Sequence, residues 1–430
     1  MSKVAELLKG EHVCITSDGW TSCANDTYMS LTVSLITRGW KLITLSVDCS
    51  KSTGTTNGKA LAVGITAAVA KHGIGGKVTA ITTHCEPSMV KMGRLLEESG
   101  VCTHIGCCNH RLESTTSLVL NGLGVKTMIT LARGLVSRYT TSSHMADRLA
   151  QFVKIYLCSD NKKPIQDVVT RWWSSCAMGS RLVELKKPIR KHEEADKLEP
   201  MLRAEHWAVL EMILPILEPF MHTQTLLEGR KYVTGSLVVP FIHGLHDNLE
   251  SAISDLEIAP PSDDADVNKA RAASVQVLAT ALDPRTKMMY GIPDDEHADV
   301  WKLVQSESVK VAVATRQEKN STVGVSQPST GGSTSSGGGG SSTARRRWRA
   351  RRTKMGGRAA PLDWWRKKSA DFPHLSILTR RVLAIPATQA ESERLFSCAG
   401  YIVTKNRNKL AKNTVELLVL LRHSWKIVEE

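Results

Sequence analysis

The sequence of 430 residues contains no apolar run long enough to cross a membrane. A spanning helix needs about 20 consecutive apolar residues. The N-terminal stretch MSKVAELLKGEHVCITSDGW is interrupted by charged residues and lacks the apolar core of a signal peptide. We therefore expect neither a membrane partner nor secretion.

The sequence also lacks a zinc-finger pattern. Its ten cysteines are scattered, and nowhere does a C-x2-C pair precede an H-x3–5-H pair. In a chain without a secretion signal, such cysteines are expected to remain reduced thiols rather than to form a disulfide framework. No repeat of about 20–50 residues is visible, which argues against a solenoid or propeller.

The chain has fewer acidic residues than basic ones. The chain has 42 Asp and Glu against 56 Lys and Arg, which gives a formal net charge of +14. Such an excess favours polyanionic partners, of which nucleic acid is the most general.

Strand-like and helix-like patterns alternate in the first part of the chain. Alternating or β-branched runs predict strands at 12–20, 28–36, 40–47, 77–83 and 103–106, and helical periodicity predicts helices at 60–71, 87–98 and 108–120. This order predicts an α/β fold with an antiparallel opening followed by a parallel portion.

The second part of the chain is helical and then changes in composition. From about residue 175 to 313, apolar residues recur at intervals of three and four positions, as in helices. Residues 320–343 are rich in Ser, Thr and Gly, as in a flexible linker. We predict a core at 1–175, a helical insertion at 176–315, a disordered linker at 316–360 and a C-terminal region at 361–430.

The C-terminal region carries an ordered series of motifs. They are the pair Trp364-Trp365, FPHLS at 372–376, LAIPAT at 383–388 and SERLFS at 392–397. Thr388 and Glu391 have the spacing of a capping box at a helix start. Upstream lie DGWTS at 18–22 and LDPRTK at 282–287. Together these strings resemble hAT-type transposases and the BED-type zinc-finger proteins descended from them.

The resemblance implies an RNase H-like mixed sheet, an all-helical insertion and C-terminal dimerisation helices that form a homodimer. It also implies a carboxylate triad whose first and last members would be Asp18 and Glu393. In the family the second member belongs to a T-D-N-x-x-N-M pattern, whereas this chain has THCEPSM at 83–89, which places His84 at the Asp position. Mg²⁺ prefers oxygen ligands in octahedral geometry, so we predict a catalytically degenerate site.

Two alternatives to this hypothesis remain. In one, the chain is an active Mg²⁺-dependent transposase that uses Asp18, Glu393 and either Glu86 or His84. In the other, it is a zinc-stabilised interaction module built on Cys107 and His110. Five Cys and His candidates crowd into nine residues: Cys102, His104, Cys107, Cys108 and His110. Structural zinc sites usually draw on two separated pairs. We therefore predict buried thiols and a hydrogen-bonded histidine, with no metal and no cofactor.

Two segments are candidates for nucleic-acid binding. TRWWSS at 170–175 resembles a family string, in which Arg171 would contact phosphate and Trp172 would either stack on a base or pack in the core. The second segment is an arginine tract with one tryptophan: Arg345, Arg346, Arg347, Trp348, Arg349, Arg351 and Arg352. The tract suits weak, nonspecific phosphate binding, nuclear import or a solvated tail without a partner. We predict a nuclear protein.

The last segment, 413–428, has a broad apolar face that either packs on its own domain or pairs with a second chain. A large exposed stripe favours aggregation in a monomer, so we predict a dimer interface. The predicted residues of this interface are Phe396, from the SERLFS string, and Leu417, Leu418, Leu421 and Trp425. The hypothesis is thus a transposon-derived protein, without a BED finger, that dimerises and binds nucleic acid.

Overall fold

The computed structural model describes residues 2–22, 26–51, 57–159, 162–168, 172–255, 274–286, 289, 292–322, 360–402 and 412–429. The chain forms two compact units. Unit 1 comprises Met1–Cys108, Leu227–Gly244 and Asp263–Glu430, and unit 2 comprises Asn109–Leu226 and Leu245–Ser262. These bounds differ from the predicted ranges, because the helical part begins directly after the last strand rather than near residue 175.

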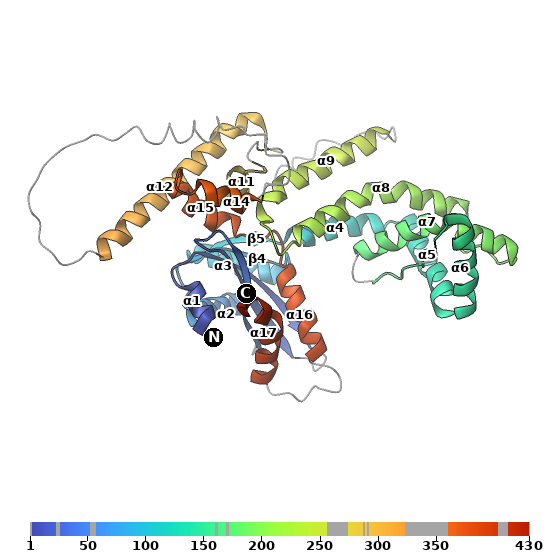
Figure 1. Cartoon of the computed structure of the whole chain (residues 1–430), viewed down its shortest axis with the longest axis horizontal. Coiled ribbons are helices and arrows are strands. Elements are labelled where there is room, and N and C mark those ends of the chain that lie inside the picture. Colours follow the sequence, from blue (N-terminus) through green and yellow to red (C-terminus); the bar gives the residue numbers. More distant parts are fainter. Residues whose placement is uncertain are drawn as a thin grey trace, which may run out of the picture. The chain divides into compact units, whose positions relative to one another are not determined.

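A five-stranded sheet forms the centre of unit 1 (Figure 1). Its strands are β1 (Val13–Thr21), β2 (Thr27–Ile36), β3 (Leu42–Lys51), β4 (Val78–Thr83) and β5 (Thr103–Gly106). The order is β3-β2-β1-β4-β5. β1, β2 and β3 pair antiparallel, whereas β4 and β5 run parallel to β1. The predicted mixed sheet is confirmed.

Helices cover both faces of this sheet. Alternation along β1 sends Val13 and Ile15 into one core cluster and Cys14 into the other. The first cluster packs against α1 (Ser2–Leu8), α2 (Gly58–Lys71) and α3 (Pro87–Glu98). The second packs against α11 (Ser274–Leu282), α12 (His297–Thr322), α14 (Pro361–Lys368) and α15 (Pro373–Leu383). β1 is therefore buried on both sides, which explains its nearly continuous apolar start.

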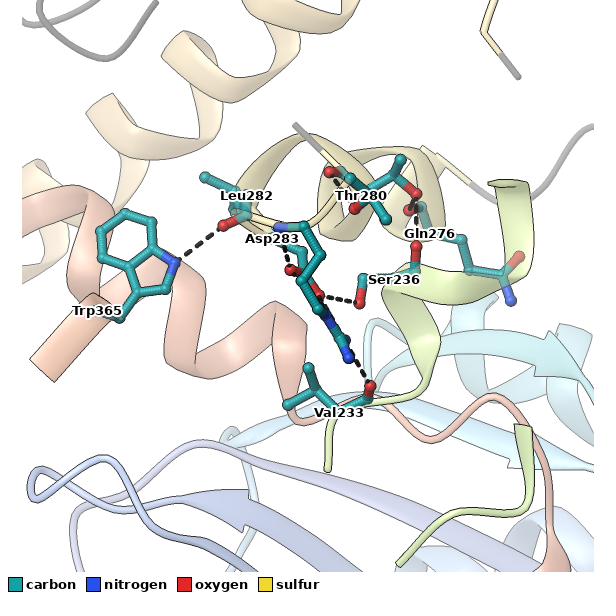
Figure 2. Close-up of polar contacts among 9 residues, drawn as sticks. Val233, Ser236, Gln276, Thr280, Leu282, Asp283 and Trp365 are labelled. Carbon is teal, nitrogen blue, oxygen red and sulfur yellow. Dashed lines mark hydrogen bonds and ion pairs between the residues drawn. The ribbon is translucent and has the colours of Figure 1, made fainter. Parts of the chain in front are cut away.

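The LDPR string forms a buried polar junction in unit 1 (Figure 2). Asp283, which is fully buried, accepts hydrogen bonds from Ser236 Oγ at 2.7 Å and from Arg285 Nη2 at 2.7 Å. Arg285 Nη2 also donates to the carbonyl of Val233 at 3.0 Å. Trp365 Nε1 donates to the carbonyl of Leu282 at 2.9 Å. The string thereby joins α11, α14 and the short helix η1 (Gly235–Leu237).

The remaining helices of unit 1 complete its C-terminal part. They are η2 (Asp294–Glu296), α16 (Ala390–Ile402) and α17 (Lys412–Glu429). α16 and α17 pack on each other and on the strands through a third cluster that includes Tyr28, Leu395 and Val419. The start of α16 differs from the predicted capping box. Thr388 Oγ1 accepts from the N–H of Ala390 at 3.4 Å, and the Glu391 carboxylate forms ion pairs with Arg230 and Arg394.

Unit 2 is built of helices. They are α4 (Cys108–Leu120), α5 (Leu123–Thr141), α6 (Ser143–Leu157), α7 (Trp172–Ala195), α8 (Ala204–Leu227) and part of α9 (Val238–Asp255). Its core holds a fully buried histidine, His192, between Tyr139 Oη at 3.1 Å and Asp196 Oδ2 at 3.1 Å. Burial lowers the pKa of His192, so the imidazole is neutral in the core at neutral pH.

A charged cluster fastens α17 to the sheet. Asp48 of β3 is buried and accepts from Lys71 Nζ at 2.8 Å, with His72 Nε2 at 3.3 Å. Glu416 of α17 lies 3.8 Å from the same lysine. Burial by itself raises the pKa of Asp48, but hydrogen bonds from His72 and Lys71 outweigh it and lower that pKa to about 2.

We predict that Asp48→Asn lowers the free energy of unfolding at pH 7 by about 2 kcal/mol. Because the folded pKa lies below the unfolded value, this stabilisation is present above about pH 4 and is lost as pH falls towards 2. Native-state hydrogen exchange of the β3 amides in unit 1, compared between both proteins at pH 7 and pH 3, measures it. The matched control is Asp363→Asn, an exposed member of an ion pair with Arg366. Equal stability of Asp48→Asn and wild type at pH 7 would refute this account of the cluster.

Candidate carboxylate site

The parallel pairing of β1 and β4 places Asp18 and His84 at one edge of the sheet. Ser17 is paired with Thr83, so the residues that follow each of them emerge side by side. α16 lies against β1 and carries Glu393. The structure therefore brings the first and last predicted members of the triad, and the histidine at the second position, to the same end of the sheet.

A glutamine joins two of these groups. Gln389 stands directly before α16 and is 2% exposed. Its Nε2 lies 3.3 Å from Asp18 Oδ2 and 3.0 Å from His84 Nδ1. An amide nitrogen carries two N–H donors, which match a carboxylate oxygen and an unprotonated imidazole nitrogen. In this orientation of the amide, Asp18 Oδ2 and His84 Nδ1 are the two acceptors.

Asp18 is a perturbed acid. Burial, together with the nearby carboxylates of Glu393 and Glu86, raises its pKa to about 7 against the lowering effect of a hydrogen bond from Gly19 N–H at 2.9 Å. Glu393 and Glu86 are themselves exposed. A half-buried carboxylate next to two other acids is the arrangement that a cation site would need, so the fit of a metal ion has to be tested.

These residues do not fit a pair of Mg²⁺ ions. Among the described residues, His246, Asp247 and Glu250 on the surface of α9 form the only group of three whose ligand atoms lie within 4.8 Å of one another. Asp18, His84 and Glu393 form no such group. Between Asp18 and His84 lies an N–H donor, which has the wrong polarity for a neighbouring cation. The imidazole offers nitrogen, whereas Mg²⁺ prefers oxygen.

The Cys and His cluster is also not assembled for a metal. Cys102, Cys107 and Cys108 are buried, and His104 Nε2 lies 2.8 Å from Thr83 Oγ1. The five candidates of 102–110 form no group of three within 4.8 Å in the described part of the chain. Burial raises the pKa of the Cys102 thiol to about 12, so in the absence of a metal this thiol is protonated at neutral pH.

Most residues predicted to contact nucleic acid lie outside the described residues. This holds for Arg171 and for the tract Arg345, Arg346, Arg347, Trp348, Arg349, Arg351 and Arg352. Trp172 begins α7, but its side chain is also outside the described set. Its neighbour Trp173 is 36% exposed. These assignments therefore stay predictions.

The predicted dimer residues divide into two groups. Leu417, Leu418 and Leu421 of α17 are 56%, 40% and 41% exposed. Phe396 requires a correction, because it is 8% exposed and stacks on Trp20 with ring centroids 6.0 Å apart. Its side chain packs within its own unit, since it fills the space between α16 and β1. The side chain of Trp425 lies outside the described residues.

Sequence reasoning missed Gln389. The residue lies between two recognisable strings, LAIPAT and SERLFS, and belongs to neither. Its position directly before the helix that carries Glu393 was the available signal, because a polar residue there faces the ends of β1 and β4.

A mixed sheet of this order, with Asp18 towards the end of its central strand β1, is the arrangement of an RNase H-like protein, here with a helical unit and C-terminal helices. Three family models of proteins related to hAT transposases match successive parts of this chain. Residues 16–107 match the ZBED1 RNase-like domain, 105–216 the ZBED1 RNase-like helical domain, and 346–425 the hAT family C-terminal dimerisation region.

Three relatives resemble most of this chain. Zinc finger BED domain-containing protein 4 of Homo sapiens is 24% identical over 78% of the chain and 30% of that protein. The putative AC transposase of Zea mays is 24% identical over 94% of the chain and 55% of that protein. The putative transcriptional regulator tpeD of Talaromyces stipitatus is 22% identical over 99% of the chain and 55% of that protein. The chain thus spans about half or less of each relative's length. No described helix combines the length and apolar character needed to span a membrane.

Proposed function

We propose that this chain acts as a nuclear, homodimeric nucleic-acid-binding protein whose transposase-like site no longer performs Mg²⁺-dependent strand transfer. The observation that carries the proposal is the Gln389 amide, which donates towards both Asp18 and His84. A metal-dependent strand-transfer site needs carboxylate oxygens that converge on one phosphate. In this chain an amide donor and an imidazole occupy that space.

Dimerisation is supported by two observations. The C-terminal segment matches a dimerisation region, and α17 exposes leucines that a monomer would leave in water. Burying such side chains against a second copy contributes about 25 cal/mol for each Å² of apolar surface removed from water. Binding through α17 would give a symmetric pair in which the same face is used twice.

Nucleic-acid binding is supported by the net charge of +14 and by the arginine tract at 345–352. Contacts of this kind are dominated by counterion release, so they depend strongly on salt and weakly on sequence. The names of two relatives, a transposase and a transcriptional regulator, agree with a DNA-associated role and a nuclear location.

We predict that the purified full chain does not nick supercoiled plasmid DNA in Mg²⁺ above the background of a protein-free sample. Asp18→Ala and Glu393→Ala should behave like wild type, since the triad they belonged to is incomplete. Agarose-gel conversion of supercoiled to open-circular plasmid measures this, with Asp299→Ala as a surface control. Mg²⁺-dependent nicking that disappears in both Asp18→Ala and Glu393→Ala would establish an active transposase instead.

A further inference from the structure

Five basic side chains gather at the edge of the sheet opposite the carboxylate site. We call this group the basic rim: His12, Arg38, Lys77, Arg380 and Arg381. His12 directly precedes β1 and Lys77 directly precedes β4, with Val13 N–H donating to the carbonyl of Lys77 at 3.0 Å. A strand rises about 3.3 Å per residue, so this edge lies about 20 Å from Asp18.

The other members of the basic rim come from neighbouring elements. Arg38 stands in the turn between β2 and β3, where Thr37 N–H donates to the carbonyl of Lys41 at 3.0 Å. Since β2 runs antiparallel to β1, this turn lies at the start of β1. α15 packs on β2 and brings Arg380 and Arg381 to the same edge. The rim is thus assembled by the fold from segments far apart in the sequence.

The charges of the rim repel one another. The pKa of His12 is lowered to about 4 by burial and by the positive charges of Arg381, Lys77 and Arg380. Burial and the charge of Arg38 also lower the pKa of Arg380, against the effect of Glu11. Glu11 forms an ion pair with one rim cation, at 3.3 Å from Arg38 Nε.

Arg380 is held in place by an aromatic ring. Its guanidinium carbon lies 5.8 Å from the centre of the Trp40 ring. Trp40 is 2% exposed and stacks on Trp365 with ring centroids 5.7 Å apart. In the described residues, no ion pair or hydrogen bond involves the side chain of Arg380. A half-buried guanidinium costs free energy unless an anion satisfies its donors.

The backbone of Trp40, the residue on which Arg380 packs, is strained. Its φ is 62°, in the left-handed region that tryptophan rarely adopts. Such backbone strain persists only where the surrounding structure holds it. Here the strained residue forms the platform on which Arg380 rests, so the rim keeps its cation in a fixed position before any ligand arrives.

We propose that the basic rim binds the phosphodiester backbone of duplex nucleic acid, with residues other than those of the carboxylate site and the arginine tract. Arg38, Lys77 and Arg380 contact the phosphates, and the guanidinium groups bind their oxygens bidentately. The neutral imidazole of His12 lines the same edge. The inference rests on the proposed nucleic-acid binding but names a different contact surface.

The test is the salt dependence of binding by the full chain to a fluorescein-labelled 20-base-pair duplex of arbitrary sequence, followed by anisotropy. In the triple variant Arg38→Gln/Lys77→Gln/Arg380→Gln, we expect the affinity at 0.1 M salt to fall at least about tenfold. The slope of log K against log salt should fall by about 0.9 for each phosphate that the variant no longer neutralises. The matched control, Lys59→Gln/Lys91→Gln/Arg94→Gln, removes three exposed charges from α2 and α3. It should retain most of the affinity and slope.

The melting temperature separates a binding role from a structural one. Neutralising mutually repelling cations should leave the melting temperature of the triple variant unchanged or higher. If wild type binds DNA and the triple variant matches the control in affinity and slope, the rim is not the contact surface, although the proposed function stands. If wild type binds no DNA, both proposals fail. A lowered melting temperature with unchanged binding would assign the rim a structural role and overturn the inference.

Discussion

Replacing Asp283 with alanine is expected to destabilise unit 1 by about 3–5 kcal/mol. The carboxylate is fully buried and accepts hydrogen bonds from Ser236 and Arg285. Its removal leaves the buried Ser236 hydroxyl without its acceptor, and it leaves a guanidinium that is only 24% exposed with the carbonyl of Val233 in place of a carboxylate. Removing one partner of a buried ion pair lowers the stability far more than the intact pair raises it, because the remaining charge stays buried.

The measurement is native-state hydrogen exchange, because a chain of two compact units need not unfold in one step. Amides of α11 and α14 should exchange at least about a hundredfold faster in Asp283→Ala, while those of α5 and α7 in unit 2 keep their rates. The control is Asp299→Ala, whose carboxylate is 74% exposed and forms an ion pair with Lys302. An effect of Asp283→Ala below about 1 kcal/mol, the range of surface pairs, would contradict this account of the LDPR string.

The second large effect concerns the exposed face of α17. The double variant Leu417→Glu/Leu421→Glu is expected to be monomeric at concentrations where wild type is dimeric. The two leucines are four residues apart, so they share one face of the helix. Four glutamates would then meet across a symmetric interface, and each would lose its hydration there. The helix itself should persist, because Val415 and Val419 hold α17 on the sheet from its other face.

Multi-angle light scattering gives the mass of the eluted protein directly. The control places the same substitution at two exposed apolar residues of unit 2, Leu118→Glu/Ile155→Glu, which are 79% and 67% exposed. It should elute with the wild-type mass. Retention of the dimer by the α17 variant would show that the pairing surface lies elsewhere, and loss of the dimer in the control would show a nonspecific effect of charge.

Much of unit 1 could be predicted from local patterns. The strands begin and end within a few residues of the predicted bounds, because apolar alternation and glycine-containing turns are local signals. The buried role of Trp365 and the polar junction around Asp283 were not predicted. Both depend on contacts between segments about 50 to 80 residues apart, such as the bond from Trp365 to Leu282.

The candidate site, too, could be predicted only in part from local sequence patterns. The motif strings were enough to select Asp18, His84 and Glu393, which lie at the same end of the sheet. No local pattern indicates that Gln389 donates towards Asp18 and His84, since that contact joins residues more than 300 positions apart. Phe396 was assigned to the dimer surface because it lies on the apolar side of its helix. Periodicity identifies an apolar face but does not say whether the same chain or a second one covers it.

Pairing through the C-terminal helices is the central claim, and sedimentation equilibrium of the intact chain tests it most directly. The chain has a mass of 47.1 kDa. At micromolar concentration we predict a single species of twice that mass. A mass of 47.1 kDa that does not change with concentration across the micromolar range would contradict the claim.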